Sequence, residues 1–394
     1  MKTALYSTTA LAAASILALG ASDASAGSHS KMKKASKVKI GVGGFFVSAI
    51  GFADNEGSFE TATGSSFSST NMYADSEIYF RGNTRLDNGI RVDVIVQLET
   101  DQRTANSALD GGSSDTAIDE SYLKFTGGFG DVRVGSTKSA LFVLKHSSPG
   151  EGLYPIGNPR TRDFIVRPGG FTTGPAAIST NVGAGDNMKI VYITPRFSGL
   201  RAGVSYQTDN DKSDVLPDRA SGNDAQAFDA TLSYEDKIGD VSVQADISYV
   251  KTMGAHGAGG AALAEAADET QYGVGLVGSV AGWSVGGRYY RSLDAGSKND
   301  ATSQTAKAYE VGVRYRSGPW GVSLQYANQK ENATRGDAGL EDEVTIWQVG
   351  GRYNIGPGVS LRGTITSAEY ENEVTAAASN NEGWAAVAGI RVGF

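Results

Sequence analysis

Residues 282–290 read GWSVGGRYY, and two later stretches, AYEVGVRYR at 308–316 and WAAVAGIRVGF at 384–394, repeat the same pattern. Every second residue in each stretch is mostly apolar or aromatic, while arginines and small or polar residues occupy the positions between. Alternate side chains of a strand lie on opposite faces, so each stretch predicts a strand with one apolar face and one arginine-bearing face. Such faces, with aromatic residues near the strand ends, are typical of a transmembrane β-barrel with lipid outside and water inside.

The first 26 residues predict a secretory signal rather than part of the barrel. Lys2 precedes an apolar, alanine-rich run over residues 5–20, and Ala24-Ser25-Ala26 fits a small-x-small cleavage site. The uninterrupted apolar run is shorter than the ~20 residues that a membrane-spanning helix needs. Residues 27–37 are basic and do not alternate, so we expect a short lead-in there and the barrel at 38–394.

Composition excludes several other classes of protein. The chain has no cysteine, which rules out disulfides, thiolate metal sites and a cysteine nucleophile. Its formal net charge of −8 argues against a nucleic-acid partner. A mean hydropathy of −0.24 suits a barrel, because half of each strand and the loops are polar.

Turn signals allow the strands to be counted. Seven short turns rich in Gly, Pro and Asn occur at 87–89, 127–130, 197–199, 236–239, 281–282, 318–319 and 356–358. Eight longer polar stretches lie between them, at 54–70, 102–116, 138–186, 209–225, 252–269, 294–306, 331–342 and 372–383. Fifteen connections join sixteen strands, so we predict an all-β, 16-stranded antiparallel barrel with short turns on one side and long loops on the other.

Three stretches and the last residue carry a resemblance to the Gram-negative general porins, in particular those of alphaproteobacteria. They are VKIGVGGFFVSAIGFA at 38–53, SYLKFTGGFGDVRVG at 121–135, KIVYITPRFSGLRAGVSY at 189–206, and Phe394. The resemblance implies an outer-membrane homotrimer, in contact with lipid and lipopolysaccharide, that lets small hydrophilic solutes and ions diffuse passively. It also implies that Phe394 is recognised by the outer-membrane assembly machinery, and that the third long loop folds into the pore and constricts it.

The third long loop is the longest here, at 138–186. It lacks the acidic Pro-Glu-Phe motif of the enterobacterial relatives, and residues 148–152 are only a loose counterpart. The expected loop side of the constriction is Glu151, Arg160, Arg162 and Asp163.

Strand alternation supplies candidates for the opposite wall. A charged side chain that faces lipid near the bilayer midplane costs roughly 2–4 kcal/mol, so charged residues on the strands are expected to point inward. The wall candidates are Arg81, Arg85, Arg91, Asp93, Arg133, Arg362 and Arg391. The alternative is that an inward arginine only solvates a wide vestibule or pairs with a neighbour. Since Asp75, Glu77 and Glu99 also point inward, we expect a weakly selective pore with a basic wall that passes anionic solutes.

Two motifs are set aside, and no cofactor is expected. Gly273-x-Gly275-x-x-Gly278 matches a dinucleotide fingerprint but lies inside an alternating strand with no helix after it. The loop that contains Asp209 and Asp211 has calcium-like spacing but lacks the required Gly and Glu, so weak calcium binding there is the minor alternative.

Other functions remain as alternatives. A hydrolase needs a histidine beside a serine, and none of His29, His146 and His256 is expected on a strand beside a nucleophile, so we expect no enzyme. Two further alternatives are a substrate-selective channel and a structural or adhesin barrel with a plugged lumen. Sixteen strands argue against the plug, because a barrel of that size leaves an aqueous channel.

Overall fold

The computed structural model describes residues 37–99, 118–158, 161, 163–169, 185–208, 226–253, 269–295, 304–331 and 341–394. The predicted signal segment 1–26, the lead-in up to residue 36, Arg160, Arg162, and the loop that contains Asp209 and Asp211 lie outside these residues.

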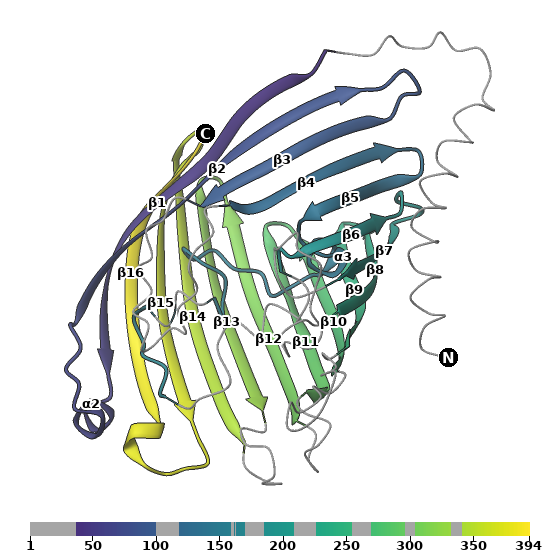
Figure 1. Cartoon of the computed structure of the whole chain (residues 1–394). Helices are drawn as coiled ribbons and strands as arrows, with labels where there is room; N and C mark the ends of the chain where they lie inside the picture. Colours follow the sequence, from purple (N-terminus) through teal and green to yellow (C-terminus); the bar gives the residue numbers. More distant parts are fainter. Residues whose placement is uncertain are drawn as a thin grey trace.

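The described residues form sixteen strands in one closed antiparallel barrel, which confirms the fold and strand number expected from the turns (Figure 1). Each strand pairs with its neighbours in sequence, and β1 pairs with β16. The strands are β1 Lys39–Asn55, β2 Thr70–Arg85, β3 Arg91–Glu99, β4 Ile118–Gly127, β5 Gly130–Ser136, β6 Met188–Ile193, β7 Leu200–Gln207, β8 Gln226–Ile238, β9 Val241–Met253, β10 Glu269–Val280, β11 Trp283–Ala295, β12 Gln304–Ser317, β13 Trp320–Glu331, β14 Asp342–Gly356, β15 Val359–Glu371 and β16 Asn381–Gly393.

The short turns lie where the sequence places them. Between β10 and β11 the turn consists of Ala281 and Gly282, with φ angles of 49° and 86°. Two successive positive φ angles match the twist of a tight hairpin, and glycine adopts such angles without steric cost. The equivalent expected turns join β2 to β3, β4 to β5, β6 to β7, β8 to β9, β12 to β13 and β14 to β15.

The seam between the first and last strands closes the barrel. β1 and β16 pair continuously from Phe45 opposite Gly393 to Asn55 opposite Gly383. Phe394 extends the seam, because its N–H donates to Gly44 O at 3.1 Å and its carbonyl accepts from Gly44 N at 3.0 Å. Along residues 44–55, closure leaves no strand edge that would need a partner in lipid.

The outward face is apolar and ends in aromatic belts. On β11, Val285 is 60% exposed while its neighbour Ser284 is 4% exposed, as the alternation predicts. Near the short turns, Trp283 stacks against Tyr315 with ring centroids 4.6 Å apart. Near the long loops, the Tyr326 ring lies 4.6 Å from that of Trp347. Both interfacial regions of a lipid-facing surface are therefore marked by aromatic side chains.

Helices are short. They are α2 Gly57–Thr63 between β1 and β2, α3 Ala140–Leu144 after β5, and a 3-10 turn at Ala377–Ser379 before β16. No helix among the described residues has the length and apolar run needed to cross a bilayer.

Candidate functional site

The segment that follows β5 lies against the inner wall of the barrel. Its backbone N–H groups donate to inward-facing side chains on β7, β8, β9, β12, β13, β15 and β1. The pairs are Ala140 N to Ser205 Oγ (2.6 Å), Leu141 N to Asp229 Oδ1 (2.9 Å), His146 N to Asp246 Oδ1 (2.7 Å), Ser148 N to Glu310 Oε1 (2.7 Å), Glu151 N to Ser323 Oγ (2.9 Å), Leu153 N to Thr364 Oγ1 (2.8 Å) and Val166 N to Asn55 Oδ1 (2.9 Å). The described part of loop 138–186 therefore runs around the inside of the barrel.

This series of contacts explains how irregular chain can lie inside the barrel. A buried backbone N–H without a partner is costly, and the loop has little regular structure to supply one. The wall supplies carboxylate, hydroxyl and amide oxygens instead, on strands where the alternation turns polar residues inward. At the start of α3, the Ser139 hydroxyl accepts from Phe142 N at 3.3 Å and caps the helix.

A buried ion pair fixes the first part of the loop. The side chains of Asp246 on β9 and Arg288 on β11 are 0% and 1% exposed, and Arg288 Nη1 lies 2.8 Å from Asp246 Oδ2. His146 contacts both partners, because its N–H donates to Asp246 and its carbonyl accepts from Arg288 Nη1 at 3.5 Å. Loop position is thereby tied to a charge pair that is shielded from water.

Two glycines on β10 make room for this anchor. A side chain at Gly275 would collide with the carbonyl of His146, and one at Gly273 would collide with the guanidinium of Arg288. Close packing therefore explains the first two glycines of the dinucleotide-like stretch, against Arg288 and Ser248 for Gly273 and against the loop for Gly275. Their place within β10 confirms that the fingerprint lacks its strand–helix context.

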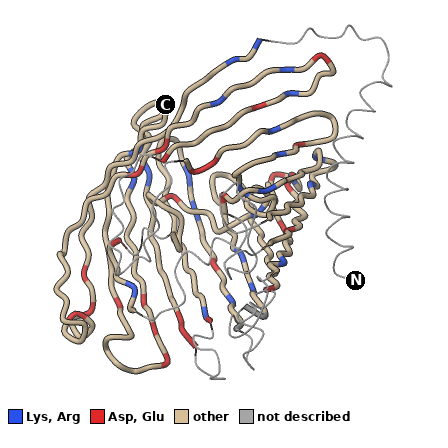
Figure 2. The backbone as a smooth tube through the Cα atoms, viewed as in Figure 1, with Lys and Arg blue, Asp and Glu red and all other residues tan. Residues whose placement is uncertain are grey.

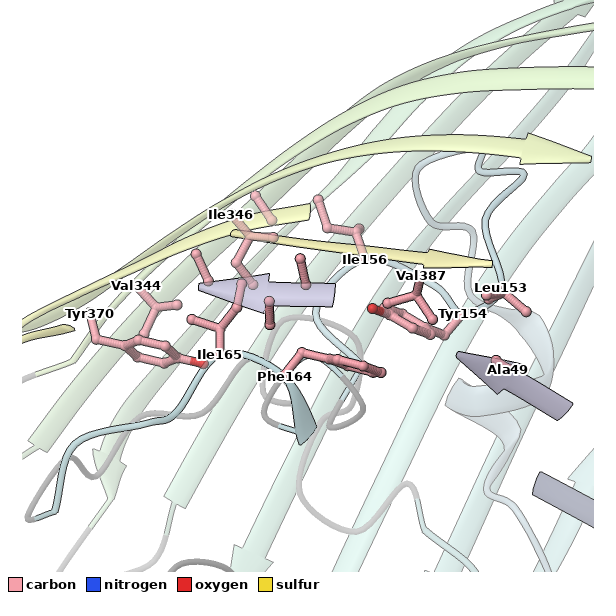
Figure 3. Close-up of a cluster of buried hydrophobic side chains, with 14 of the residues drawn as sticks. Ala49, Leu153, Tyr154, Ile156, Phe164, Ile165, Val344, Ile346, Tyr370 and Val387 are labelled. Atoms are coloured by element: carbon pink, nitrogen blue, oxygen red, sulfur yellow. The ribbon is translucent and has the colours of Figure 1, made fainter. Parts of the chain in front are cut away.

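An apolar cluster holds the later part of the loop (Figure 3). Its loop members are Leu153, Tyr154, Ile156, Phe164 and Ile165, and they pack on inward-facing apolar side chains of the wall. The wall members are Val47, Ala49, Ala53, Tyr290, Ala308, Ala327, Val344, Ile346, Ala368, Tyr370, Ala385 and Val387. The inner face therefore also carries apolar side chains in this part of the wall, beside the arginines and small or polar residues that the alternation predicts. The physical reason is that the loop covers these positions and keeps water away from them.

Arginines surround a single loop carboxylate. The Glu151 side chain is 1% exposed and accepts from Arg316 Nε. Its Oε2 lies 3.1 Å from Arg352 Nε, and its Oε1 lies 3.5 Å from Arg314 Nε. Arg362 Nη1 donates a hydrogen bond to Gly152 O at 3.4 Å. Glu151 is therefore a buried counter-ion that joins the loop to basic residues on β12 and β14, and the carbonyl of Gly152 adds a contact with β15.

Beside this cluster lies a pocket of about 310 Å³ between the loop and β1, β2, β3 and β16. Carboxylates of Asp75, Glu77 and Glu99 line one part of it, and Arg391 lines another. Figure 2 shows basic and acidic positions close together near the C-terminus, where these strands meet. Charges of both signs thus face the same small space.

The predicted wall residues fall into three groups. Arg362 and Arg391 lie at the level of the loop. Arg81 and Arg133 lie on the wall over tyrosine rings, with their guanidinium carbons 5.4 Å from the Tyr79 centroid and 5.7 Å from the Tyr122 centroid. The remaining three lie at the short-turn end of β2 and β3: Arg85 donates to Gly89 O at 2.9 Å, and Arg91 pairs with Asp93 at 2.7 Å.

Of the predicted loop residues, Glu151 and Asp163 are described. Asp163 lies beside β2, where its backbone carbonyl accepts from Asn71 Nδ2 at 2.9 Å. Arg160 and Arg162 lie outside the described residues.

Sequence reasoning did not single out Arg314, Arg316, Arg352, or the pair of Asp246 and Arg288. Alternation already places Arg288, Arg314 and Arg316 on the inward face. What it lacks is the path of the loop, which selects the inward residues that become contacts. Two inward glycines in β10, Gly273 and Gly275, were the available signal of close approach.

One expectation about the histidines needs correction. His146 Nε2 lies 3.1 Å from Ser233 Oγ, so a histidine does stand beside a serine. The acid near it, Glu235, approaches the same nitrogen at 3.7 Å, and Arg196 holds that acid at 2.7 Å. In a catalytic triad the acid orients the imidazole through its other nitrogen, so this contact lacks the triad arrangement. Burial also lowers the pKa of the His146 imidazole.

Two groups of carboxylates among the described residues are compact enough to share a cation. They are Glu77, Glu99 and Asp119, and Asp119, Glu120 and Asp186. In the second group the Lys138 ammonium lies 3.1 Å from Glu120 Oε1 and 3.9 Å from Asp186 Oδ1. Burial raises the pKa of the Asp186 carboxyl to about 7, against the attraction of Lys138. A lysine thus supplies positive charge to that group.

Comparisons with known proteins agree with this architecture. The profile of the Gram-negative porin family matches residues 7–373. No curated protein sequence matches the chain. Among solved structures, the anion-selective porin from Comamonas acidovorans superposes with a TM-score of 0.59 at 17% identity, over 91% of this chain and 100% of that one. The trimer form of OmpT, an outer membrane protein of Vibrio cholerae, gives 0.60 at 11% identity, over 91% and 100%. A variant of the Rh. blastica porin gives 0.54 at 16% identity, over 90% and 100%.

Proposed function

The chain belongs to the family of Gram-negative porins, and we propose that the space left beside its inner loop is the narrow part of a water-filled channel. A porin is a multi-pass barrel of the outer membrane through which small hydrophilic solutes diffuse passively. The observation that carries the proposal is the loop itself, which hydrogen-bonds around the inner wall beside a pocket lined by charges of both signs. Diffusion of this kind requires no cofactor and no energy source.

We place the constriction at the level of Glu151, Arg362 and Arg391, with Asp163 at the β2 side of the loop. Five arginines lie at this level: Arg314, Arg316, Arg352, Arg362 and Arg391. The acids near them are Glu151, Asp163, Asp75, Glu77 and Glu99, with Asp119 in the same compact group as the last two. Arginine stays protonated at any working pH, so the basic wall is permanent, and we propose that it favours anions weakly. The anion-selective porin of Comamonas acidovorans, which has the same fold, is consistent with this preference.

A reversal potential across a KCl gradient in a planar bilayer tests the channel and its preference together. We expect stepwise conductance without nucleotide, and a reversal potential whose sign shows that chloride permeates faster than potassium. Arg391→Gln should move the potential toward cation preference, while Arg85→Gln, at the short turn, should change it less. Absence of any conductance from inserted protein would overturn the channel, and strong cation preference would overturn the basic wall.

The assembly is proposed to be a homotrimer in the outer membrane, in contact with lipid and lipopolysaccharide. Support comes from the family and from OmpT, which has the same fold and was solved in a trimer form. Phe394 closes the seam opposite Gly44 and is 66% exposed on the lipid face. An exposed aromatic terminus of this kind is available to the assembly machinery, so deleting Phe394 should lower the inserted yield without changing the conductance of assembled channels.

We propose no enzymatic role. The contact of His146 with Ser233 is the nearest approach to one among the described residues, and its acid stands on the wrong side of the imidazole. Hydrolysis of a generic ester by purified protein, lost in Ser233→Ala, would contradict this.

A further inference from the structure

The pocket beside the loop is lined by opposite charges that are held apart from one another. Val47, which is 3% exposed, pairs with Asp75 on β2 and with Arg391 on β16. The acid and the base therefore occupy one row of the wall on either side of an apolar residue. Two strand spacings separate their Cα atoms by about 10 Å.

The basic end of the pocket is fixed in place. The guanidinium carbon of Arg391 lies 3.9 Å from the centroid of the Phe45 ring. A cation over an aromatic face is attracted to it, which holds the guanidinium on β1 rather than against the acids of β2. The guanidinium therefore borders the pocket at a defined position.

The acidic end is built from neighbouring strands. Glu77 on β2 pairs directly with Glu99 on β3, and their carboxylates belong to the same compact group as Asp119. The aromatic rings of Tyr73 on β2 and Tyr154 on the loop also line the pocket. An ammonium group suits this end, because it would relieve the repulsion between the carboxylates.

The size and polarity of the pocket select the class of ligand. At about 30 Å³ per molecule, its volume of about 310 Å³ corresponds to roughly ten waters, which is room for a small solute. A simple cation would meet Arg391, and a simple anion would meet the three acids. A solute with an ammonium and a carboxylate on one short skeleton would satisfy both ends.

We propose that this pocket is a binding subsite for small zwitterionic solutes of the amino-acid type, with the ammonium at Glu77 and Glu99 and the carboxylate at Arg391. The subsite rests on the proposed channel, because solutes reach the pocket by way of the conducting path. It gives a pore of broad selectivity a place where one class of solute resides for longer.

The test uses the purified full chain in a planar bilayer at 0.1 M KCl, with β-alanine as the probe. The single-channel current should fall with β-alanine concentration and reach a plateau. Propionate, propylammonium and propionamide, which carry one charge or none, should give no such saturable effect. Raising KCl to 1 M should weaken the β-alanine effect, since salt screens exposed charges.

Variants assign the effect to the pocket. Arg391→Gln should raise the β-alanine concentration that gives half of the maximal effect by about tenfold or more, since hydrogen bonds to charged groups contribute on that order. Glu99→Gln should also raise the half-saturating concentration. This variant alone carries the test if the Arg391→Gln protein does not insert into the bilayer. Arg391→Lys keeps the charge and should retain much of the effect, while Arg85→Gln at the short turn is the matched control.

The outcomes separate the subsite from the channel. Conductance that β-alanine and propionamide reduce equally overturns the subsite and leaves the channel intact. An effect of propylammonium equal to that of β-alanine and insensitive to Arg391→Gln also overturns it, in favour of a cation site. Absence of conductance in the unmodified protein overturns the channel and the subsite together.

Discussion

The inner wall of the barrel has two parts that follow the same alternation but differ in environment. From β7 round to β16 and β1 the loop contacts the wall, and it buries charged residues such as Arg288, with 1% of its side chain exposed. On the short-turn ends of β2 and β3 the wall is open, and the Arg91 side chain is 51% exposed beside Asp93. An inward charge can therefore be a buried structural anchor where the loop covers it, and it is solvated where the loop does not reach. Contact with the loop makes the difference.

Removing one partner of an ion pair from each part gives the largest expected contrast. Asp246→Ala leaves Arg288 buried without its partner and removes the acceptor of His146 N–H, which should cost about 3–5 kcal/mol. Asp93→Ala removes an exposed pair and should cost about 0–1 kcal/mol. Denaturant unfolding in detergent, followed by intrinsic fluorescence, measures both. Equal losses would mean that the buried pair does not anchor the loop.

The apolar contacts of the loop provide the next contrast. Ile165 is 0% exposed against the wall, so Ile165→Ala should weaken docking by about 2–5 kcal/mol. Ile365, 57% exposed on the outward face of β15, is the matched isoleucine, and its replacement by alanine should leave the loop in place. Limited proteolysis within residues 138–186, together with open-channel noise, reports loop release. Rapid cleavage of both variants, or of neither, would contradict the assignment of Ile165.

Alternation and turn chemistry predict nearly all of the barrel, because strand faces and hairpin geometry are local properties. Trp283 and Ser284 lie on the faces that the pattern assigns, and the turn of Ala281 and Gly282 is where the sequence puts it. Ala385 and Val387 show the limit. They sit inward although they are apolar, because the loop, far away in sequence, covers them.

The candidate site is less predictable for the same reason. Whether a side chain points inward follows from the alternation along its strand, so Arg362 and Arg391 could be named from the sequence. Height along the barrel and loop contact depend on long-range packing, so Arg85 could not be separated from them, and Arg352 was not singled out. Glu151 was expected as a pore charge, and only the fold reveals that arginines enclose it.

Neutralising that enclosed acid should change ion preference more than stability. Glu151→Gln removes the counter-charge of Arg314, Arg316 and Arg352 while keeping a polar side chain of similar size. The constriction then becomes more positive by one charge, and the chloride-to-potassium permeability ratio should increase a few-fold at low salt and less at high salt. Glu382→Gln, on the exposed outward face of β16, is the control and should leave the reversal potential unchanged. A shift toward cations in the Glu151 variant would contradict this account of the wall.

The smallest expected effect is a pH dependence of loop docking that arises from Lys145. Burial, reinforced by the charge of Arg288, lowers the pKa of the Lys145 ammonium from an ordinary value of 10.5 to about 8, although Glu310 and Asp246 oppose the shift. Below pH 8 the amine is charged whether the loop is docked or released, so the docked loop bears the full cost of burying that charge. Between about pH 8 and 10.5 only the released form keeps its proton, so docking strengthens as pH rises through this window.

Limited proteolysis of the loop at pH 7.5 and pH 9.5, normalised to the protease rate on an unfolded substrate, measures this dependence. Cleavage should slow at the higher pH in the unmodified protein. Lys145→Met removes the titrating group while keeping an apolar stem over the Phe142 ring, which the lysine ammonium now approaches to 4.5 Å. The variant should therefore dock the loop equally at both pH values, and a pH dependence that persists in it would assign the effect to another titrating group.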